Sequence, residues 1–551
     1  MTAKSVNQFS RQTEPSRFIA QNTLFKGFPR PRLGAGAERS TTAQLLSCMY
    51  HERGRRRPTT GRRPQKGDAS GEPSAWPFQS PLNSYKEIAM EEHRDPTSWA
   101  LLWALRGLAL ALIALHLATP WFTESMAWGL WPITYLPAGW RWALSLLALA
   151  AVLGGDRLPT GLLRCPSAAS PLIGWGLALA SAIPFYFLRI RHLRWGDARL
   201  LVEAIPHPDF RLTYVWQAPL DVFVHAKAWA LGNRAFGWAD PRPVYWILST
   251  AAGVVFVRTL WGLAGWLGRD RLERGLLLGL VLSLGTIQLF FGYIENYSLM
   301  TVGVLAYAWL AMRTLQGKMA LRWPALALAL THAFHPSTLI LVPSLLYAGW
   351  IGWRQERGAS SNASSAFWRR LAEIAVPYTL VFVAVLALMT AGGHGLDALL
   401  GVDFPGGGDR RWFVPLFETT TRFERYTMFS LGHLVDVLNQ QLLVAPVVWP
   451  ALLLGALLSW GRLPRHDPLF RFLLAMAGCY LLLTLTWNPD YGGQRDWDLF
   501  APAAVPAALL LAYTLPRLLP ERAALRGAGW ALVAAQVLHT LAWIYRNTLP
   551  A

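Results

Sequence analysis

Residues 99–118 read WALLWALRGLALALIALHLA, an apolar run in which Arg106 and His116 are the only ionisable residues. About 20 apolar residues are enough to cross a hydrocarbon core of roughly 30 Å as a helix. Similar runs recur from this point to the C-terminus. A backbone exposed to lipid must satisfy its own hydrogen bonds, and the alternating pattern of barrel strands is absent. The sequence therefore predicts an all-α, polytopic bundle of transmembrane helices.

The composition excludes an ordinary soluble domain. Of the 551 residues, 53% are hydrophobic, only 15% are charged and 28 are Trp. The formal net charge of +19 comes from basic residues in the N-terminal segment and in short loops between apolar runs. Because this distribution is typical of membrane topology signals, we do not expect nucleic-acid binding. The three cysteines are scattered without CxxC spacing, which predicts neither a disulfide framework nor a cysteine metal site.

The N-terminal segment, residues 1–95, differs from the rest of the chain. It is rich in Arg, Ser, Thr, Pro and Gly and has no hydrophobic period, so we expect it to be disordered. An organelle transit peptide is an alternative that its acidic residues disfavour. Met90 lies just ahead of the first apolar run, and we expect it to be the true start. The membrane domain then covers residues 96–551.

The apolar runs predict about thirteen membrane spans. The loops between them form two alternating sets, of which one is basic and therefore cytoplasmic. All the unusual polar motifs fall in the other set, so we expect one site on the outer face. The predicted spans are 99–118, 128–153, 170–188, 243–267, 275–292, 298–313, 321–334, 338–353, 372–391, 440–460, 469–487, 499–517 and 527–545.

The first large outer loop, residues 189–242, opens with RWGDAR at 194–199. Asp197, a carboxylate at the mouth of the bundle, is the leading catalytic candidate, and the alternative is a simply hydrated side chain. Glu203 is a weaker, substrate-binding candidate. Two segments, 198–204 and 220–231, have apolar residues at helical spacing and predict amphipathic helices at the membrane interface. In the second segment, Asp221 and His225 lie four residues apart and predict a structural pair.

Glu295 lies in the short connection GYIENYS, residues 292–298. A charge this close to the hydrocarbon is costly unless it is solvated or paired, so Glu295 is a second catalytic candidate. A solvated turn between interfacial tyrosines is the alternative.

Two histidines interrupt the next outward crossing in THAFHP, residues 331–336. His332 and His335 are three residues apart and could bind phosphate or a metal, and Pro336 predicts a helix break at His335. An imidazole hydrogen-bonded inside the bundle is the alternative. We take both histidines as substrate-binding candidates.

Two later outer loops add charged residues. The first contains GGGDRR at 406–411 and, further on, Arg425. Its arginines could close over an anionic ligand or merely contact lipid headgroups. The second contains NPDYGGQRDWD at 488–498, with Arg495, Asp496 and Asp498. The two aspartates, together with Asp197, could hold a divalent cation such as Mg or Mn, and a structural network around Arg495 is the alternative.

Three features resemble the C-type (GT-C) integral-membrane glycosyltransferases over residues 170–520. These are Gly196-Asp197 just outside an early span, the long first outer loop with amphipathic helices, and His335-Pro336 followed by Leu341-Val342-Pro343. The resemblance implies transfer of a sugar from a polyprenyl-phosphate-linked donor to an acceptor on the extracytoplasmic face, in a bacterial plasma membrane. The chain departs from the family in lacking a paired Asp-Asp or Asp-Glu and in having two extra spans at the start.

The resemblance also implies roles for individual residues. Asp197 would remove the proton of the acceptor hydroxyl or assist metal binding, and Arg425, Arg495 or His335 would stabilise the departing phosphate. The implied partners are the lipid-linked donor and membrane lipid. A multi-pass transporter or flippase for lipid-linked glycans or another anionic substrate is the alternative. A transporter would carry ionisable groups in mid-span, and a flippase would keep the cationic loops without needing the carboxylates.

Overall fold

The computed structural model describes residues 95–157, 171–207, 216–359, 363–396 and 412–550. The chain divides into two units, Met1–Ile88 and Ala89–Ala551, and all described residues belong to the second. The predictions for residues 1–94, including the start at Met90, and for the loop 406–411 lie outside the described residues. The described part forms helices and no strand, with one isolated bridge between Phe413 and Trp487, which confirms the all-α prediction.

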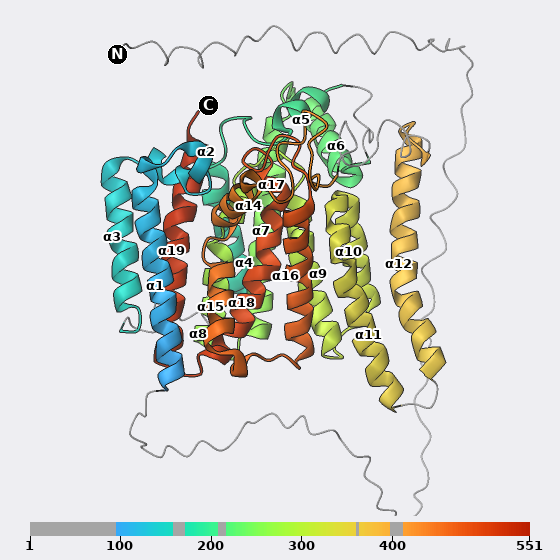
Figure 1. Cartoon of the computed structure of the whole chain (residues 1–551). Coiled ribbons are helices and arrows are strands. Elements are labelled where there is room, and N and C mark those ends of the chain that lie inside the picture. The colour runs from blue at the N-terminus through green and yellow to red at the C-terminus, as the bar shows by residue number, and fades with distance from the viewer. Residues whose placement is uncertain (1–94, 158–170, 208–215, 360–362, 397–411, 551) are drawn as a thin grey trace, which may run out of the picture. The chain divides into compact units, whose positions relative to one another are not determined.

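The helices follow one another along the chain as Figure 1 labels them. Their bounds are α1 Pro96–Ala118, η2 Thr119–Trp121, α2 Glu124–Ala127, η3 Trp131–Tyr135, α3 Ala138–Gly154, α4 Pro171–Phe187, α5 Ala198–Ala204, α6 Pro219–Phe236, α7 Arg242–Leu267, α8 Arg271–Leu282, η6 Gly285–Phe290, α9 Ser298–Leu315, α10 Arg322–Phe334, η7 Pro336–Leu341, α11 Val342–Ala359, α12 Ala363–Ala391, α14 Leu431–Val444, α15 Val448–Leu458, η8 Trp460–Arg462, α16 Pro468–Thr486, α17 Trp497–Phe500, η9 Ala501–Ala503, α18 Ala504–Leu518 and α19 Arg522–Thr548.

Among the described residues, seven helices are long and apolar enough to cross a membrane, and eight if the bent pair α14 and α15 counts as one span. The chain therefore has the helices of a multi-pass membrane protein, but the prediction of thirteen spans is not confirmed. The seven candidate spans are Pro96–Trp121, Arg242–Leu267, Ser298–Leu315, Ser364–Ala391, Pro468–Thr486, Trp497–Leu518 and Arg522–Thr548.

Some predicted spans do not form one continuous helix, because an apolar run shows its length but not its breaks. The run 275–292 is divided between the 12-residue α8 and the 3-10 helix η6. The run 321–334 gives only the 13-residue α10. All six residues of η6 are buried, so protein rather than lipid surrounds this irregular backbone.

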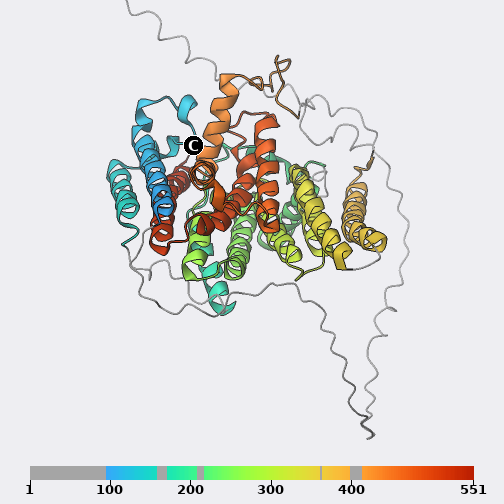
Figure 2. The same ribbon diagram turned by 60° about the horizontal axis from the view of Figure 1, so that its bottom comes forward.

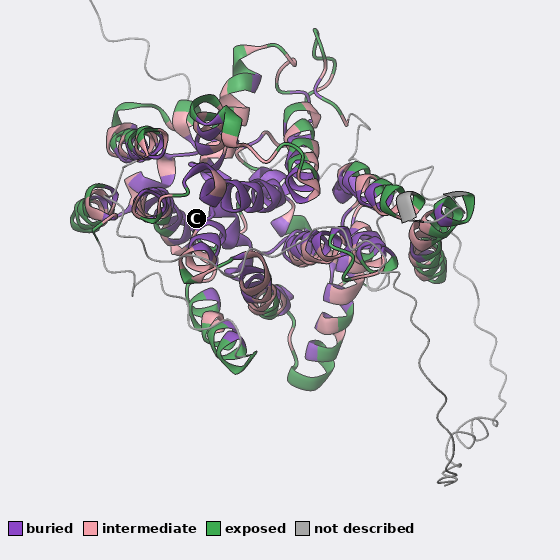
Figure 3. Cartoon of the chain, turned by 90° about the horizontal axis from the view of Figure 1, so that it is seen from below, coloured by how far each residue is buried: buried purple, intermediate pink, exposed green. Residues whose placement is uncertain are grey.

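The core of the bundle is built around α18, which packs against α8, α15 and α16. The apolar stretch that includes α18, within Trp497–Leu518, is the most completely buried of the candidate spans. Seen from below, buried residues gather in the middle of the bundle and exposed ones at its margin (Figure 3). The cyan α3 and the gold α12 lie at opposite edges in both side views (Figures 1 and 2). The exposed apolar side chains at the margin suit contact with lipid tails.

Helix ends and breaks determine where the polar motifs lie. The helix α10 stops at Phe334, His335 is extended with φ −159° and ψ 125°, and Pro336 starts η7. Proline disfavours a helical conformation in the residue before it, so the predicted break at His335 is confirmed and explained. The predicted segment 198–204 is α5 and the segment 220–231 lies within α6, so both are helical.

Candidate functional site

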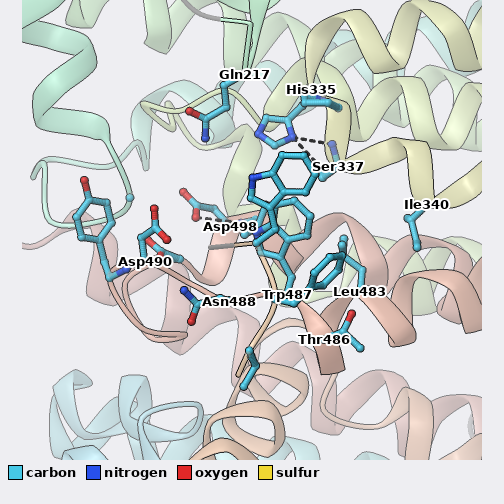
Figure 4. A pocket seen from close by; sticks show the side chains of 18 of the residues that line it. Gln217, His335, Ser337, Ile340, Leu483, Thr486, Trp487, Asn488, Asp490 and Asp498 are labelled. Carbon is cyan, nitrogen blue, oxygen red and sulfur yellow. Dashed lines mark hydrogen bonds between the residues drawn. The ribbon is translucent and has the colours of Figure 1, made fainter. Parts of the chain in front are cut away.

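A cavity of about 850 Å³ lies where several of these helix ends meet. It is bordered by the start of α5, the turn before α9, η7, the loop after residue 412, the end of α16 and the segment that leads into α17. Figure 4 shows the polar Gln217, Asp490 and Asn488 on one side and the apolar Ile340 and Leu483 on the other. Asp197, Glu295, His335, Asp496 and Asp498 line this cavity. The structure thus brings together five of the nine predicted site residues.

Asp197 is held by backbone geometry and by two neighbouring segments. Gly196, with φ +47°, turns the chain immediately before it, and the Gly196 amide donates to the Arg495 carbonyl over 3.0 Å. The backbone amide of Asp197 donates to Glu295 Oε1, and the Tyr491 hydroxyl donates to Asp197 Oδ1 over 3.0 Å. The backbone and the carboxylate of Asp197 are therefore each held at the cavity wall by a distant residue, 98 and 294 positions away.

Glu295 is buried, with 3% of its surface exposed, rather than solvated as the alternative interpretation required. Burial raises its pKa well above the usual range, and the nearby negative charges of Asp498 and Asp197 raise it further. Burial also raises the pKa of Asp197, against the opposing effects of the Tyr491 hydrogen bond and the Arg495 charge. A carboxyl whose pKa lies closer to neutrality is a better proton acceptor at neutral pH than an ordinary aspartate.

The raised pKa of Glu295 predicts a pH-dependent stability. The folded protein keeps this proton to a higher pH than the unfolded chain, whose glutamates titrate at about 4.3. The contribution of Glu295 to stability is therefore complete below that value and is lost as the pH rises through the raised pKa. Between pH 4 and 7, we expect the melting temperature of the detergent-purified wild type to fall relative to that of Glu295→Gln. Parallel melting curves of the two proteins across this range would contradict the prediction.

Asp496 and Asp498 flank Trp497 at the start of α17. This segment is a helical turn rather than an extended strand, yet both side chains line the same cavity. The Tyr491 amide donates to Asp496 Oδ2 over 2.8 Å, and the Tyr293 hydroxyl donates to Asp498 Oδ2 over 2.9 Å. Burial raises the pKa of Asp496 well above its usual range, and repulsion from Asp498 adds to the shift.

These contacts bear on the predicted divalent cation. Within the described ranges, no group of three or more His, Cys, Asp or Glu side chains is arranged to hold a metal ion. Asp197, Asp496 and Asp498 are therefore not grouped as three ligands of one metal ion. Their oxygens accept hydrogen bonds from tyrosine hydroxyls and backbone amides instead of converging on one point.

His335 contributes a neutral imidazole. It is 4% exposed, and burial lowers its pKa to about 4. The backbone amide of Ser337 donates to His335 Nδ1 over 3.2 Å, which assigns the ring proton to Nε2. His335 can thus donate one hydrogen bond to a ligand. It is uncharged, however, and so cannot bind a phosphate by electrostatic attraction.

Four predicted residues are absent from the described cavity wall. Glu203 is exposed on α5 and pairs with Arg199 over 2.8 Å. His332 hydrogen-bonds Thr338 over 2.6 Å and Tyr378 of α12 over 2.8 Å, so it links helices inside the bundle. Arg425 does not border the cavity either.

Arg495 is the fourth of these residues, and it is exposed outside the cavity. Its guanidinium stacks over the Tyr491 ring at 4.2 Å and donates to the Gly196 carbonyl over 3.2 Å. It therefore positions the segment that carries Asp197. The described lining carries five carboxylic acids and neither lysine nor arginine, so the predicted cationic contacts from Arg425 and Arg495 are not present there.

Several residues of this region were not predicted. Tyr491, which orients Asp197, lies in the motif 488–498, but nothing in the sequence indicates its partner. Asp436 of α14 accepts hydrogen bonds from Trp128 Nε1 over 2.9 Å, from the Tyr426 hydroxyl over 2.9 Å and from the Gly493 amide over 2.8 Å. Asp436 therefore connects the loop 488–496 to α14 by a hydrogen bond. The predicted pair of Asp221 and His225 is confirmed, with both side chains buried and 2.9 Å between Oδ2 and Nδ1.

One wall of the cavity is apolar and open to the surroundings. Four apolar side chains line this wall, with exposed fractions between 52% and 60%. They are Leu339 of η7, Leu482 of α16, and Phe413 and Leu416 of the segment before α14. The cavity thus has two parts. One part contains buried carboxyl groups that can exchange a proton, and the other is an exposed apolar surface that suits an apolar chain. Comparison of the chain with protein-family models, with curated proteins and with solved structures finds no match.

Proposed function

We propose that this protein is a membrane glycosyltransferase that moves a sugar from a polyprenyl-phosphate-linked donor to an acceptor hydroxyl on the extracytoplasmic face. One observation carries the proposal. Asp197, Glu295 and Asp498, from three distant segments, line a single cavity whose opposite wall is apolar. A lipid-linked sugar has the same two-sided character, with an isoprenoid chain attached to a polar head.

The chemistry requires a proton acceptor beside the attacking hydroxyl. The acceptor oxygen forms a bond to the anomeric carbon, the bond from that carbon to the phosphate oxygen breaks, and the phosphate leaves with the electron pair. Asp197 takes the hydroxyl proton, because Tyr491 and the Gly196 turn hold its carboxylate at the wall. A protonated Glu295 and the Nε2–H of His335 are neutral donors that can hydrogen-bond the developing phosphate charge.

The exposed apolar wall of the cavity supports a lipid carrier as the donor. Leu339 and Leu482, each more than half exposed, line this wall and would contact the isoprenoid chain. The segregation of basic loops supports an orientation with the cavity on the outer side, in a bacterial plasma membrane. Nucleotide-sugar donors are available on the opposite, cytoplasmic side.

A transfer assay tests the proposal. The purified protein is reconstituted into liposomes and supplied with radiolabelled sugars on polyprenyl phosphate, with the same sugars on nucleotides as the donor control. We expect label to move from the lipid to a hydroxylated acceptor only with the lipid-linked donor. Movement of the intact labelled lipid across the bilayer without transfer would instead establish the transporter or flippase alternative.

A further inference from the structure

A second, smaller cavity of about 20 Å³ lies behind the segment that carries Asp197. Its walls come from the region between α1 and α3, from the segment 194–195, from Gln494 and from the end of α19. Trp128, Trp131, Tyr135, Trp195 and Trp543 make it strongly aromatic. The proposed transfer reaction does not use this cavity.

Arg546 of α19 is the unusual member of this wall. Only 7% of its surface is exposed, and its guanidinium stacks over the Tyr135 ring at 4.3 Å. Within the described part of the chain, the guanidinium has neither an acidic partner nor a hydrogen-bond acceptor. A buried charge without a counter-ion is costly, so such an arginine indicates a ligand that supplies the missing negative charge.

The other charged residues of the cavity do not supply that charge. Glu124 accepts hydrogen bonds from Gln494 Nε2 over 3.0 Å and from Arg194 over 3.4 Å. The wall therefore holds two arginines and one glutamate, which leaves an excess of one positive charge. The neighbouring His192 is affected by the same positive charges. Burial, followed by the charges of Arg546 and Arg194, lowers the pKa of His192 to about 4.

We propose that this cavity is an anion site that binds the oxygen atoms of a phosphate group against Arg546. The guanidinium matches phosphate geometry and stays charged at any physiological pH. A volume of about 20 Å³ accommodates roughly one water-sized group, so one phosphate oxygen enters and the rest of the anion stays at the mouth. The source is either a phospholipid headgroup or soluble phosphate, and the two share this chemistry.

The anion site shares a wall with the large cavity. Trp195 and Gln494 line the small cavity, whereas the adjoining Gly196, Asp197 and Asp496 line the large one. The hydrogen bond from the Gly196 amide to the Arg495 carbonyl joins the two segments of this wall. A bound phosphate therefore braces the segment that positions Asp197.

The test is a melting-temperature titration of the detergent-purified protein at constant ionic strength. One arm adds inorganic phosphate, and the other adds short-chain phosphatidylglycerol micelles. We expect a saturable rise in at least one arm, since a ligand at 100 times its Kd stabilises the folded state by about 2.7 kcal/mol. A rise with phosphate identifies the soluble anion, and a rise with the lipid alone identifies the headgroup.

Arg546→Gln should abolish the rise in melting temperature, and Arg546→Lys should weaken it. The control is Arg191→Gln, which changes an exposed arginine between α4 and α5 and should leave the rise intact. An equal rise in the wild type and in Arg546→Gln would overturn the proposal. If Arg546→Gln fails to fold, the wild type still decides, because a response that grows linearly without saturation in both arms also overturns it. The proposal is independent of sugar transfer, so either can fail alone.

Discussion

Asp197→Asn is expected to lower kcat for sugar transfer by about 10²–10⁴-fold, the usual contribution of a positioned general base. Asparagine keeps the size of the side chain and can still contact the Tyr491 hydroxyl, but it cannot accept the proton of the acceptor. In the proposed mechanism the apolar wall holds most of the donor, so we expect KM for the lipid-linked donor to change much less than kcat. Initial rates with varied donor concentration separate the two parameters.

The matched control for this variant is Asp240→Asn. Asp240 lies in the same loop, residues 189–242, and its replacement by asparagine is the same chemical change. Its carboxylate pairs with the exposed Arg242 and does not line the cavity. We expect kcat to stay at the wild-type level. If Asp197→Asn also retained wild-type kcat, Asp197 would have no part in proton transfer, and the proposed mechanism would be wrong.

Gly196→Ala is the second variant with a large expected effect. Gly196 has φ +47°, in the left-handed region, where a side chain costs about 1–2 kcal/mol. A Cβ atom at this position would also contact the Glu295 carboxylate and come within 2.9 Å of Asp498 Oδ2. Both carboxylates would have to move, and a misplacement of about 1 Å in an active site can cost about 10²-fold in rate. We expect a loss of that size in kcat, measured in the transfer assay.

Gly237→Ala separates the two causes. Gly237 ends α6 with φ +68°, but nothing lies within 4 Å of a Cβ atom built there. This variant therefore carries the conformational cost alone, and it should lower thermal stability to a similar extent while kcat stays unchanged. A loss of activity in Gly237→Ala equal to that in Gly196→Ala would show that backbone strain, rather than displacement of the carboxylates, causes the effect.

The charge of the loops predicts which polar residues lie together, whereas hydropathy does not give the number of spanning helices. Sorting the loops by charge assigned Asp197, Glu295, His335, Asp496 and Asp498 to one face, and these residues do line one cavity. Topology signals group segments that are far apart in the chain, which is enough to bring their polar residues to one end of a bundle.

The breaks in the helices and the contacts of Arg495 could not be predicted, because they depend on local geometry. The break of the run 275–292 at Ser283 follows from packing inside the bundle, which a hydropathy window does not record. Arg495 was expected to face a phosphate, but the positive φ of Gly196 brings the carbonyl of that residue within reach of its guanidinium. Nor does the sequence show that a tyrosine hydroxyl and a backbone amide donate hydrogen bonds to Asp498 and Asp496.

The position of α12 at the edge of the bundle has a consequence for the choice of membrane. Only 11% of its apolar window is buried, so the thickness of the surrounding bilayer should largely set its tilt. His332 joins Tyr378 of α12 to Thr338 of η7, and η7 forms part of the cavity wall. A thicker or thinner lipid environment would therefore act on the cavity through α12, by this imidazole and by the packing of α12 against α10 and α11. The length of the lipid acyl chains should therefore affect the shape of the cavity.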